Sequence, residues 1–478
     1  MTFASFRFLL VFLPLILAVY ELAGRRKKEY ALDVLTAGSL LFYSFFGWDM
    51  TALLLLQCIL NYYLCRMLAA NRRKAVFAAA VSLNVLILIF FRYTNFFIDC
   101  FNGMMKSSVP GLSLLVPVGI SYYTFQLTAL LSDIYSGAVM NMNFREYLFY
   151  MLYFPKMIQG PILQYPAFMK QIDEAGELRV RSANLAYGLE LFSIGMAKKI
   201  LMADTFGKAV DYTYSHIGSS GSISIIASAV FYSLQLYLDF SGYCDMACGI
   251  SWMFGIRLPH NFRAPYRAVS IGDFWKRWHI SLTDFLRKYI YFPLGGSRRG
   301  KARTYLNIMI IFLISGFWHG ADWTFILWGF LHGVLSCADR MIGKSYEKLP
   351  KVLRWLITMM LVTVLWMLFR SESLTQFAQL MKQLVKPGNF RMTGGLVDFD
   401  YFPVLQFLDV FIEGNQWLEM LAGMGLLTLA GFAVCLLEKE ERIPHERFTR
   451  FSVYRTAVLL IWSMLSLSSI VTFLYQRF

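Results

Sequence analysis

The amino-acid sequence predicts an all-α polytopic membrane protein. The chain has 478 residues, of which 57% are hydrophobic and 16% are charged, and its mean hydropathy is +0.51. Apolar stretches long enough to cross a bilayer recur along the whole chain, and clusters of Lys and Arg flank them. A water-soluble domain carries far less apolar surface, so these observations exclude a soluble fold.

Thirteen apolar stretches are candidate spans. The first is expected to be retained rather than cleaved, because its strongest charge cluster follows the apolar run. The clusters Arg25–Lys28 and Arg72–Lys74 are expected in the cytosol, which places the N-terminus outside. The candidates begin near residues 8, 31, 51, 75, 113, 146, 184, 222, 304, 323, 352, 416 and 454.

Loop charge reduces this number by one. If every candidate crossed, the strongly basic segment 257–303 would lie outside, which is unfavourable. Residues 153–161, which contain two prolines and a glycine, form the weakest candidate between residues 137 and 183. Because proline lacks a backbone donor, this segment is expected to dip into the membrane and to be buried by neighbouring protein. The sequence therefore predicts about twelve crossings plus re-entrant and interfacial helices.

Successive loops alternate between the two sides of the membrane, and with twelve crossings this alternation places residues 371–415 outside. This segment holds five acidic and three basic residues, which suits an external face. It is a candidate contact for a partner protein or, alternatively, a solvated linker.

The net charge of +15 does not indicate nucleic-acid binding, because the basic residues cluster beside apolar spans. The seven cysteines form no CxxC pair, and Cys244 and Cys248 are one helical turn apart. They are expected to pack between helices, so neither disulfides nor a metal site is predicted.

Residues 273–288 are expected to form one amphipathic helix at the cytoplasmic interface. On a helical wheel its apolar residues gather on one side, with Trp275 and Trp278 in the headgroup zone, and its polar residues on the other. His279 falls at the shoulder of the apolar face. It is either a packing residue or a polar group at the mouth of an interior cavity. The apolar side comprises Trp275, Trp278, Leu282, Phe285 and Leu286, and the polar side Lys276, Arg277, Thr283, Asp284, Arg287 and Lys288.

A second histidine, His319, ends the apolar run that starts at Ile308. An imidazole at membrane depth favours its neutral form, which can accept a proton from a hydroxyl or thiol. His319 is therefore a candidate general base, and the alternative is a histidine satisfied by a carbonyl of a neighbouring helix. His332 is a weaker candidate, for which packing is favoured.

Two carboxylates, Asp239 and Asp245, lie inside an apolar segment. Unpaired acids inside a membrane are unfavourable, so these side chains are expected to pair or to line a wet cavity. Lys276, Arg277 or an imidazole is the expected partner. A supporting structural role is favoured over direct chemistry for both.

Motifs for several other reactions are missing from the chain: there is no P-loop, HExxH or GxSxG. What the chain does contain resembles the membrane-bound O-acyltransferase (MBOAT) family, in particular its bacterial alginate O-acetylase branch. The resemblance extends over most of the chain. The segments that carry it are 8–20, Val116–Phe125, Phe154–Lys156 with Gly160–Ile162, Asp239–Asp245, Asn261–Tyr266, Phe274–Leu282, Tyr291–Gly296, and Phe317–Gly320 with Trp328–Gly329.

This resemblance implies a ring of tilted helices around a tunnel that joins a cytosolic pocket to the far face. It implies that His319 is the catalytic histidine and His279 a second polar histidine. The acyl donor would be a cytosolic thioester, acetyl-CoA or an acyl carrier, acting as substrate with no bound cofactor. The partners would be a separate extracytoplasmic transferase and a polysaccharide acceptor in a plasma or inner membrane setting. Residues implied to bind the donor or line the tunnel are Trp275, Lys276, Arg277, Trp278, Trp318, Asp239, Asp245 and Asn261, with Arg298 and Arg299 near CoA phosphates.

Three positions depart from the family pattern: Lys288, His260 and Gln159. They leave both catalytic histidines in place and concern the details of donor and acceptor binding.

Residues 1–478 are predicted to form a single membrane domain. It would comprise N-terminal helices in 1–110, a catalytic core in 111–345 and C-terminal helices in 346–478. Two alternatives stay open. One is D-alanyl transfer to teichoic acid from a carrier-protein thioester. The other is a secondary transporter, although the chain shows no repeated halves and its polar residues gather in 239–319.

Overall fold

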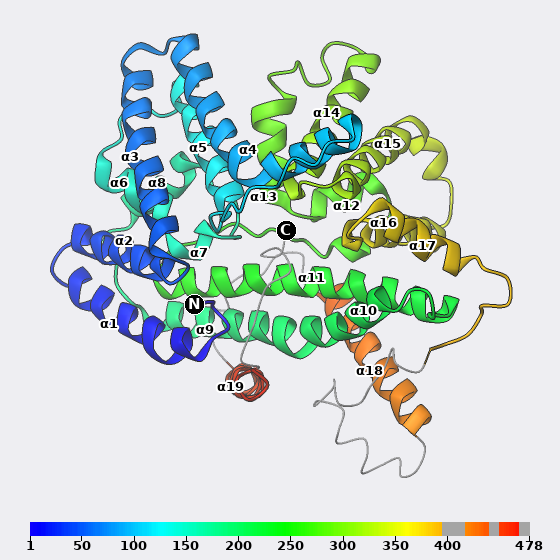
Figure 1. Cartoon of the computed structure of the whole chain (residues 1–478). Helices are drawn as coiled ribbons and strands as arrows, with labels where there is room; N and C mark the ends of the chain where they lie inside the picture. The colour runs from blue at the N-terminus through cyan, green and yellow to red at the C-terminus, as the bar shows by residue number, and fades with distance from the viewer. Residues whose placement is uncertain (394–415, 439–448, 468–478) are drawn as a thin grey trace. The chain divides into compact units, whose positions relative to one another are not determined.

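The structure is a computed structural model that describes residues 1–393, 416–438 and 449–467. Every regular element within these residues is helical (Figure 1). The chain divides into two compact units. The first combines residues 1–192 with 244–260, and the second combines residues 193–243 with 261–478. Helices α9 (Ser182–Ala197) and α11 (Ser222–Met253) each contribute residues to both units.

The first unit is built from the N-terminal helices. Helices α3, α4 and α5 pack against one another (Figure 1), and buried amides join two of them, since Asn61 and Asn84 exchange hydrogen bonds of 3.0 and 2.6 Å. The elements are η1 (Phe8–Phe12), α1 (Leu13–Gly24), α2 (Lys28–Ser44), α3 (Trp48–Asn71), α4 (Lys74–Met105), α5 (Ile120–Ser136), α6 (Phe144–Leu152), α7 (Phe154–Met157), α8 (Tyr165–Glu174) and most of α9.

The broken segment predicted at residues 153–161 is present. Helix α6 has nine residues and α7 only four, so neither reaches the roughly 30 Å of a bilayer core. Every residue from Phe149 to Ile162 is buried, as expected for irregular backbone that protein must cover. Lys156 lies within this segment, where it donates to Gln126 Oε1 at 2.7 Å and lies 3.9 Å from the centre of the Tyr150 ring.

The second unit holds the remaining helices. Its elements are η2 (Lys198–Ala203), α10 (Asp204–Ser215), most of α11, η3 (Pro265–Arg267), α12 (Ile271–Arg277), α13 (Ile280–Leu286), η4 (Arg287–Tyr291), α14 (Lys301–His319), α15 (Trp323–Tyr346), α16 (Lys351–Arg370), α17 (Leu374–Leu384), α18 (Gln416–Leu437) and α19 (Arg450–Leu465). Residues 394–415 of the predicted external segment lie outside the described residues, and its described part contains α17.

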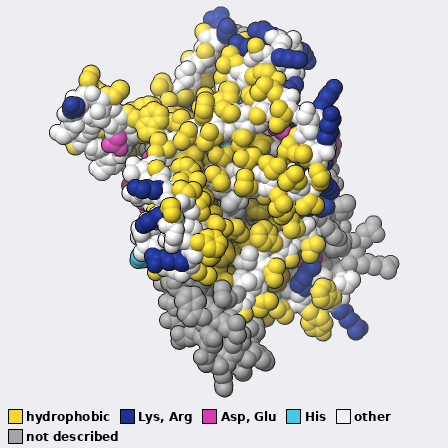
Figure 2. Space-filling model, turned by 90° about the vertical axis from the view of Figure 1, so that its right-hand side faces the viewer, with side chains coloured by type: hydrophobic (Ala, Val, Ile, Leu, Met, Phe, Trp, Pro, Cys, Tyr) yellow, Lys and Arg dark blue, Asp and Glu magenta, His cyan; other side chains and the backbone are white. Residues whose placement is uncertain are grey.

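Five of the described helices are long and apolar enough to cross a membrane: α3, α4, α11, α15 and α16. The chain is thus a multi-pass membrane protein, while the count of about twelve crossings stays a prediction. The candidate span near residue 113 is misplaced, because regular helix begins only at Ile120. Large apolar side chains such as Leu86, Phe330 and Met360 are exposed, and Figure 2 shows a face on which hydrophobic side chains predominate. Such a surface suits contact with lipid.

Helices α14 and α15 pack closely because glycines meet where they touch. A Cβ added to Gly316 would lie 3.0 Å from Gly329 Cα, and one added to Gly329 would lie 2.4 Å from Phe312 O. Only glycine allows the two backbones to approach this closely. The three residues 320–322 connect the helices, so their relative placement is also fixed by a short loop.

Replacing Gly329 by Ala is expected to force α14 and α15 apart and to lower the melting temperature. Gly343→Ala is the matched control in the same helix, because its added Cβ meets nothing within 4 Å. Removing a helical glycine there stabilises the helix by about 0.5–1 kcal/mol. Thermal unfolding of the two variants in the same detergent measures the difference, and equal melting temperatures would contradict the close-packing interpretation.

Candidate active site

His319 is the last residue of α14, and the sequence that follows ends the helix there. Gly320 has an extended backbone, with φ −169° and ψ 155°. The Asp322 carboxylate then accepts a hydrogen bond of 2.8 Å from Thr324 N, which caps the start of α15. These residues place His319 at the turn between two closely packed helices.

The imidazole of His319 is 4% exposed and lies among aromatic rings. The ring centroids of Trp318, Trp328 and Phe369 lie 4.9, 5.2 and 5.3 Å from it, each in an edge-to-face arrangement. Protein and not solvent therefore surrounds this imidazole. His319 thus ends an apolar helix, as the sequence predicts, and its catalytic role stays a prediction.

His279 corrects the prediction of one continuous helix over residues 273–288. The helix breaks between α12 and α13, and His279 adopts the left-handed conformation with φ +45° and ψ 53°. A non-glycine residue in this region is strained, by about 1–3 kcal/mol, and persists only where its surroundings hold it. The wheel analysis could not detect this break, because a single left-handed residue leaves the apolar spacing of the flanking residues intact.

Asn261 holds the backbone beside His279. Its carbonyl oxygen accepts from Ile280 N at 3.0 Å, and its side-chain Oδ1 accepts from Ser281 N at 3.1 Å. Both donors belong to the first turn of α13, which has no helical partner for them. Asn261 therefore positions the histidine turn. The sequence marked this residue for the site, but its bonds are to backbone.

The position of His279 is interior and not at the edge of an interfacial helix. The residue is 0% exposed, and its ring contacts Phe240 at a centroid distance of 4.8 Å and Trp318 at 6.1 Å. Both ring nitrogens are buried, and neither has a hydrogen-bond partner among the described residues. Burial lowers the pKa of His279 to about 3, so this ring stays neutral at physiological pH. His279 and His319 thus contact the same ring, that of Trp318.

Two tryptophans expected in the headgroup zone are buried, so that prediction is wrong. Trp278 is 1% exposed and packs against Phe274 and Trp366. Trp275 is 9% exposed, and its indole N–H donates to His332 Nδ1 at 3.2 Å. The apolar side of α12 and α13 faces protein here, and the helical wheel cannot distinguish protein from lipid.

The expected partner of Asp239 is also corrected. Its Oδ1 lies 2.5 Å from Lys199 Nζ, and the same ammonium lies 2.7 Å from Asp204. Lys199 belongs to the π-helical turn η2, in which an extra residue per turn redirects the side chains. The sequence placed Lys199 within a span and missed this pairing, because the two residues lie on different helices.

Asp245 is 8% exposed and follows Asp239 by six residues on α11. That spacing separates the two side chains by about 120° around the helix axis. Asp245 belongs to the first compact unit and Asp239 to the second, so the expected common role of the two carboxylates gains no support.

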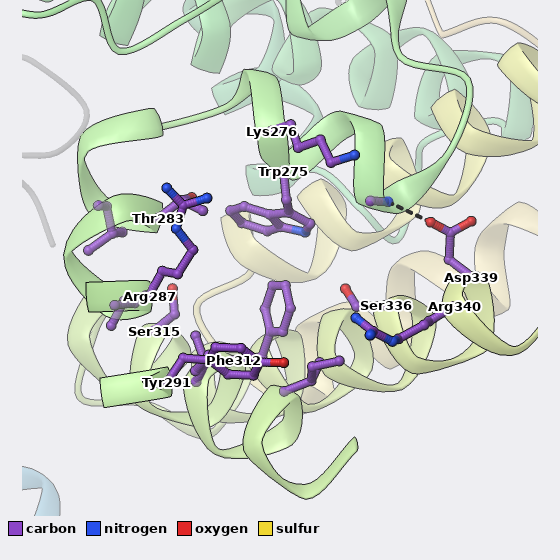
Figure 3. A pocket seen from close by; sticks show the side chains of 15 residues that line it. Trp275, Lys276, Thr283, Arg287, Tyr291, Phe312, Ser315, Ser336, Asp339 and Arg340 are labelled. Atoms are coloured by element: carbon purple, nitrogen blue, oxygen red, sulfur yellow. Dashed lines mark hydrogen bonds between the residues drawn. The ribbon is translucent and has the colours of Figure 1, made fainter. Parts of the chain in front are cut away.

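A cavity of about 470 Å³ lies among α12, α13, η4, α14 and α15 (Figure 3). Trp275 and Phe312 project into it from opposite sides, with Arg287 on one side and Arg340 on the other. Asp339 holds one wall in place, because its Oδ2 accepts from Gly272 N at 2.8 Å and from Ser270 Oγ at 3.0 Å. The cavity is apolar inside and cationic at its edge.

The basic residues expected to attract donor phosphates divide into two groups. Lys276 lines the cavity and is exposed. Arg277 instead binds the Asp273 carboxylate at 2.8 Å and the Arg263 carbonyl at 3.2 Å, while Arg298 and Arg299 are exposed and are not part of the cavity lining.

Sequence reasoning missed Arg340, and its expectation of a packing role for His332 stays a prediction. Both belong to a series at four-residue spacing on α15, formed by Trp328, His332, Ser336 and Arg340. Residues four apart share a helix face, and Ser336 and Arg340 line the cavity while Trp328 contacts His319. A polar series at this spacing on an otherwise apolar span was the available signal.

Comparison with known proteins gives a consistent result. The model of the family described as MBOAT, membrane-bound O-acyltransferase, matches residues 39–374. A protein named peptidoglycan O-acetyltransferase from Helicobacter pylori is 36% identical over 73% of this chain and 73% of its own length. A probable alginate O-acetylase from Pseudomonas syringae is 34% identical over 82% of this chain and 77% of its own. A teichoic acid D-alanyltransferase from Bacillus subtilis is 29% identical over 54% of this chain and 66% of its own.

Replacing Lys199 by Met is expected to destabilise the protein by about 3–5 kcal/mol, because it leaves a buried carboxylate without its partner. Asp239→Asn in the same chain removes that charge and is expected to recover much of the loss. Arg25→Met is a control at a solvent-exposed ion pair, worth about 0–1 kcal/mol. Thermal unfolding measures all of these variants, and a Lys199→Met melting temperature equal to that of the control would rule out a structural ion pair.

Proposed function

Because this chain belongs to the membrane-bound O-acyltransferase family, and is therefore an O-acyltransferase, we propose that it moves an acetyl group from a cytosolic thioester to an acceptor outside the membrane. The acceptor is the hydroxyl of an extracytoplasmic polysaccharide, reached through a separate transferase. The membrane is the plasma or inner membrane, with the N-terminus outside.

Acetyl is favoured over D-alanyl as the transferred group. The relatives named for O-acetylation match 73% and 82% of the chain, whereas that named for D-alanyl transfer matches 54%. These names cover both peptidoglycan and alginate, so the proposal specifies the class of acceptor, a polysaccharide.

The observation that carries the proposal is the pair of buried histidines that both contact the Trp318 ring. His319 and His279 are 4% and 0% exposed and lie among aromatic rings. A neutral imidazole in a site without water is suited to accept a proton from an attacking hydroxyl. For His279, packing alone would be served better by an apolar residue, since a buried imidazole whose nitrogens have no partner among the described residues is unfavourable.

The reaction follows from these positions. His319 takes the proton of the hydroxyl that enters this site as the first acceptor, and the oxygen attacks the thioester carbonyl carbon. A C–O bond forms, the C–S bond breaks, and the leaving thiolate receives the proton from the imidazolium. His279, whose ring nitrogens have no partner among the described residues, is positioned to hydrogen-bond a reacting group.

The cationic cavity supports a thioester that carries phosphates as the donor. Lys276 and Arg340 both line it and form no ion pair among the described residues. Phosphate groups bind such side chains through charge-assisted hydrogen bonds. The apolar interior between Trp275 and Phe312 suits the uncharged arm that ends in the thioester.

Purified wild-type protein, supplied with radiolabelled acetyl-CoA, is expected to release CoA thiol and to transfer label. His319→Ala is expected to lose about 100-fold or more of this rate, the effect typical of removing a general base. In cells lacking the natural gene, the wild type should restore ester-linked acetate on a cell-surface polysaccharide and His319→Ala should not. Thioester turnover that survives His319→Ala would overturn the proposal.

The double variant Lys276→Ala/Arg340→Ala is expected to raise the KM for acetyl-CoA about tenfold while leaving kcat nearly unchanged, since it removes binding shared by ground and transition states. Its KM should also depend less on salt concentration. Lys344→Ala, an exposed cation on α15 outside the cavity, is the control. A KM unaltered in the double variant would mean that the donor phosphates bind elsewhere.

A further inference from the structure

Three buried N–H groups near His319 have no acceptor. The indole nitrogens of Trp328 and Trp366 and Nε2 of His332 are all buried, and none has a hydrogen-bond partner in the described part of the chain. Trp328 and His332 are 0% exposed and Trp366 is 1% exposed. Each unsatisfied buried donor costs about 1–3 kcal/mol, so three in one place indicate an acceptor that binds there.

The three rings contact one another. The Trp328 centroid lies 4.7 Å from that of His332 and 5.8 Å from that of Trp366, and His332 and Trp366 are 6.3 Å apart. Trp328 also contacts the imidazole of His319 edge-to-face at 5.2 Å. The rings that carry these donors therefore form one cluster beside the candidate general base, on the facing helices α15 and α16.

The hydrogen bond from Trp275 determines which nitrogen of His332 carries its proton. An indole N–H is a donor only, so His332 Nδ1 must accept it. In the neutral imidazole the proton then sits on Nε2, on the other side of the ring from Trp275. Since Trp275 lines the cavity, the N–H of His332 points away from the residue that forms this wall.

We propose that Trp328, Trp366 and His332 form the oxyanion-binding donors of the reaction. This inference rests on the proposed acyl transfer and adds the groups that stabilise its intermediate. As the acceptor oxygen bonds to the thioester carbon, the carbonyl π electrons move to oxygen, and the N–H groups bind the resulting negative charge. When the C–S bond breaks, the pair returns and the carbonyl re-forms. Preorganised donors in a dry site do this without reorientation of solvent.

Replacing Trp328 or Trp366 by Phe keeps an aromatic ring and removes the N–H. Each variant is expected to lower kcat for acetyl-CoA turnover about 100-fold with little change in KM, because an oxyanion forms only in the transition state. Trp355→Phe is the matched control in the same unit, since its indole N–H donates to the Tyr266 carbonyl at 2.7 Å. It should lower the melting temperature and leave kcat unchanged.

Two substitutions of His332 separate its catalytic N–H from its structural bond. Asn places an acceptor near Nδ1 and keeps the contact with Trp275, but it has no group at Nε2. Gln places an N–H near Nε2. The proposal expects His332→Gln to retain kcat within about tenfold and His332→Asn to lose about 100-fold.

The possible outcomes distinguish a failure of the proposed oxyanion site from a failure of the proposed acyl transfer. Loss of turnover in His319→Ala together with wild-type kcat in Trp328→Phe, Trp366→Phe and His332→Asn overturns the oxyanion site alone. The oxyanion site is also overturned if Trp328→Phe and Trp366→Phe lower the melting temperature, as Trp355→Phe is expected to do, but leave kcat unchanged. Turnover that persists in His319→Ala overturns the acyl-transfer proposal itself.

Discussion

The contact between α14 and α15 at Gly316 and Gly329 is the constraint on which the site depends. Side chains at these positions would push the helices apart. With glycine, the backbones approach, and the short turn at Gly320 sets His319 against Trp328. Trp328 in turn connects His319 to His332 and Trp366. The positions of the proposed general base and of the proposed oxyanion donors therefore both follow from this helix contact.

Buried polar groups in this protein fall into two kinds. Some are paired: Lys199 with Asp239, Asn61 with Asn84, and Asn261 with the first turn of α13. These pairs connect neighbouring segments in the protein interior, where an unpaired polar group would be unfavourable. Others have no hydrogen-bond partner among the described residues, and they include both nitrogens of His279 and the N–H groups around His332. The first kind contributes to stability, and the members of the second kind that lie beside His319 are the ones to which a binding role is proposed.

The arrangement also separates binding from chemistry. The proposed phosphate-binding cations Lys276 and Arg340 line the cavity and are exposed, so their attraction acts over distance. The histidines and the tryptophans Trp328 and Trp366 are buried among aromatic rings, where hydrogen bonds to a developing charge are strongest. One helix, α15, links the two regions through its series from Trp328 to Arg340.

The sequence by itself determined the class of the protein, its apolar helices in outline and the broken segment at residues 153–161, and it singled out His279 and His319 as candidates. These follow from local composition and spacing, which act through solvent and lipid regardless of the rest of the fold. The resemblance of ordered motifs to one family was also readable, and the family comparison confirmed it.

Only the tertiary structure decided the break of the helix at His279, the burial of Trp275 and Trp278, the pairing of Asp239 with Lys199, and the places of Arg340 and His332. Each depends on a neighbour distant in sequence. A helical wheel shows which residues share a face, but it does not show whether protein or lipid covers that face. The partner of a buried charge is likewise set by helix packing, which cannot be inferred from the residues next to that charge in the sequence.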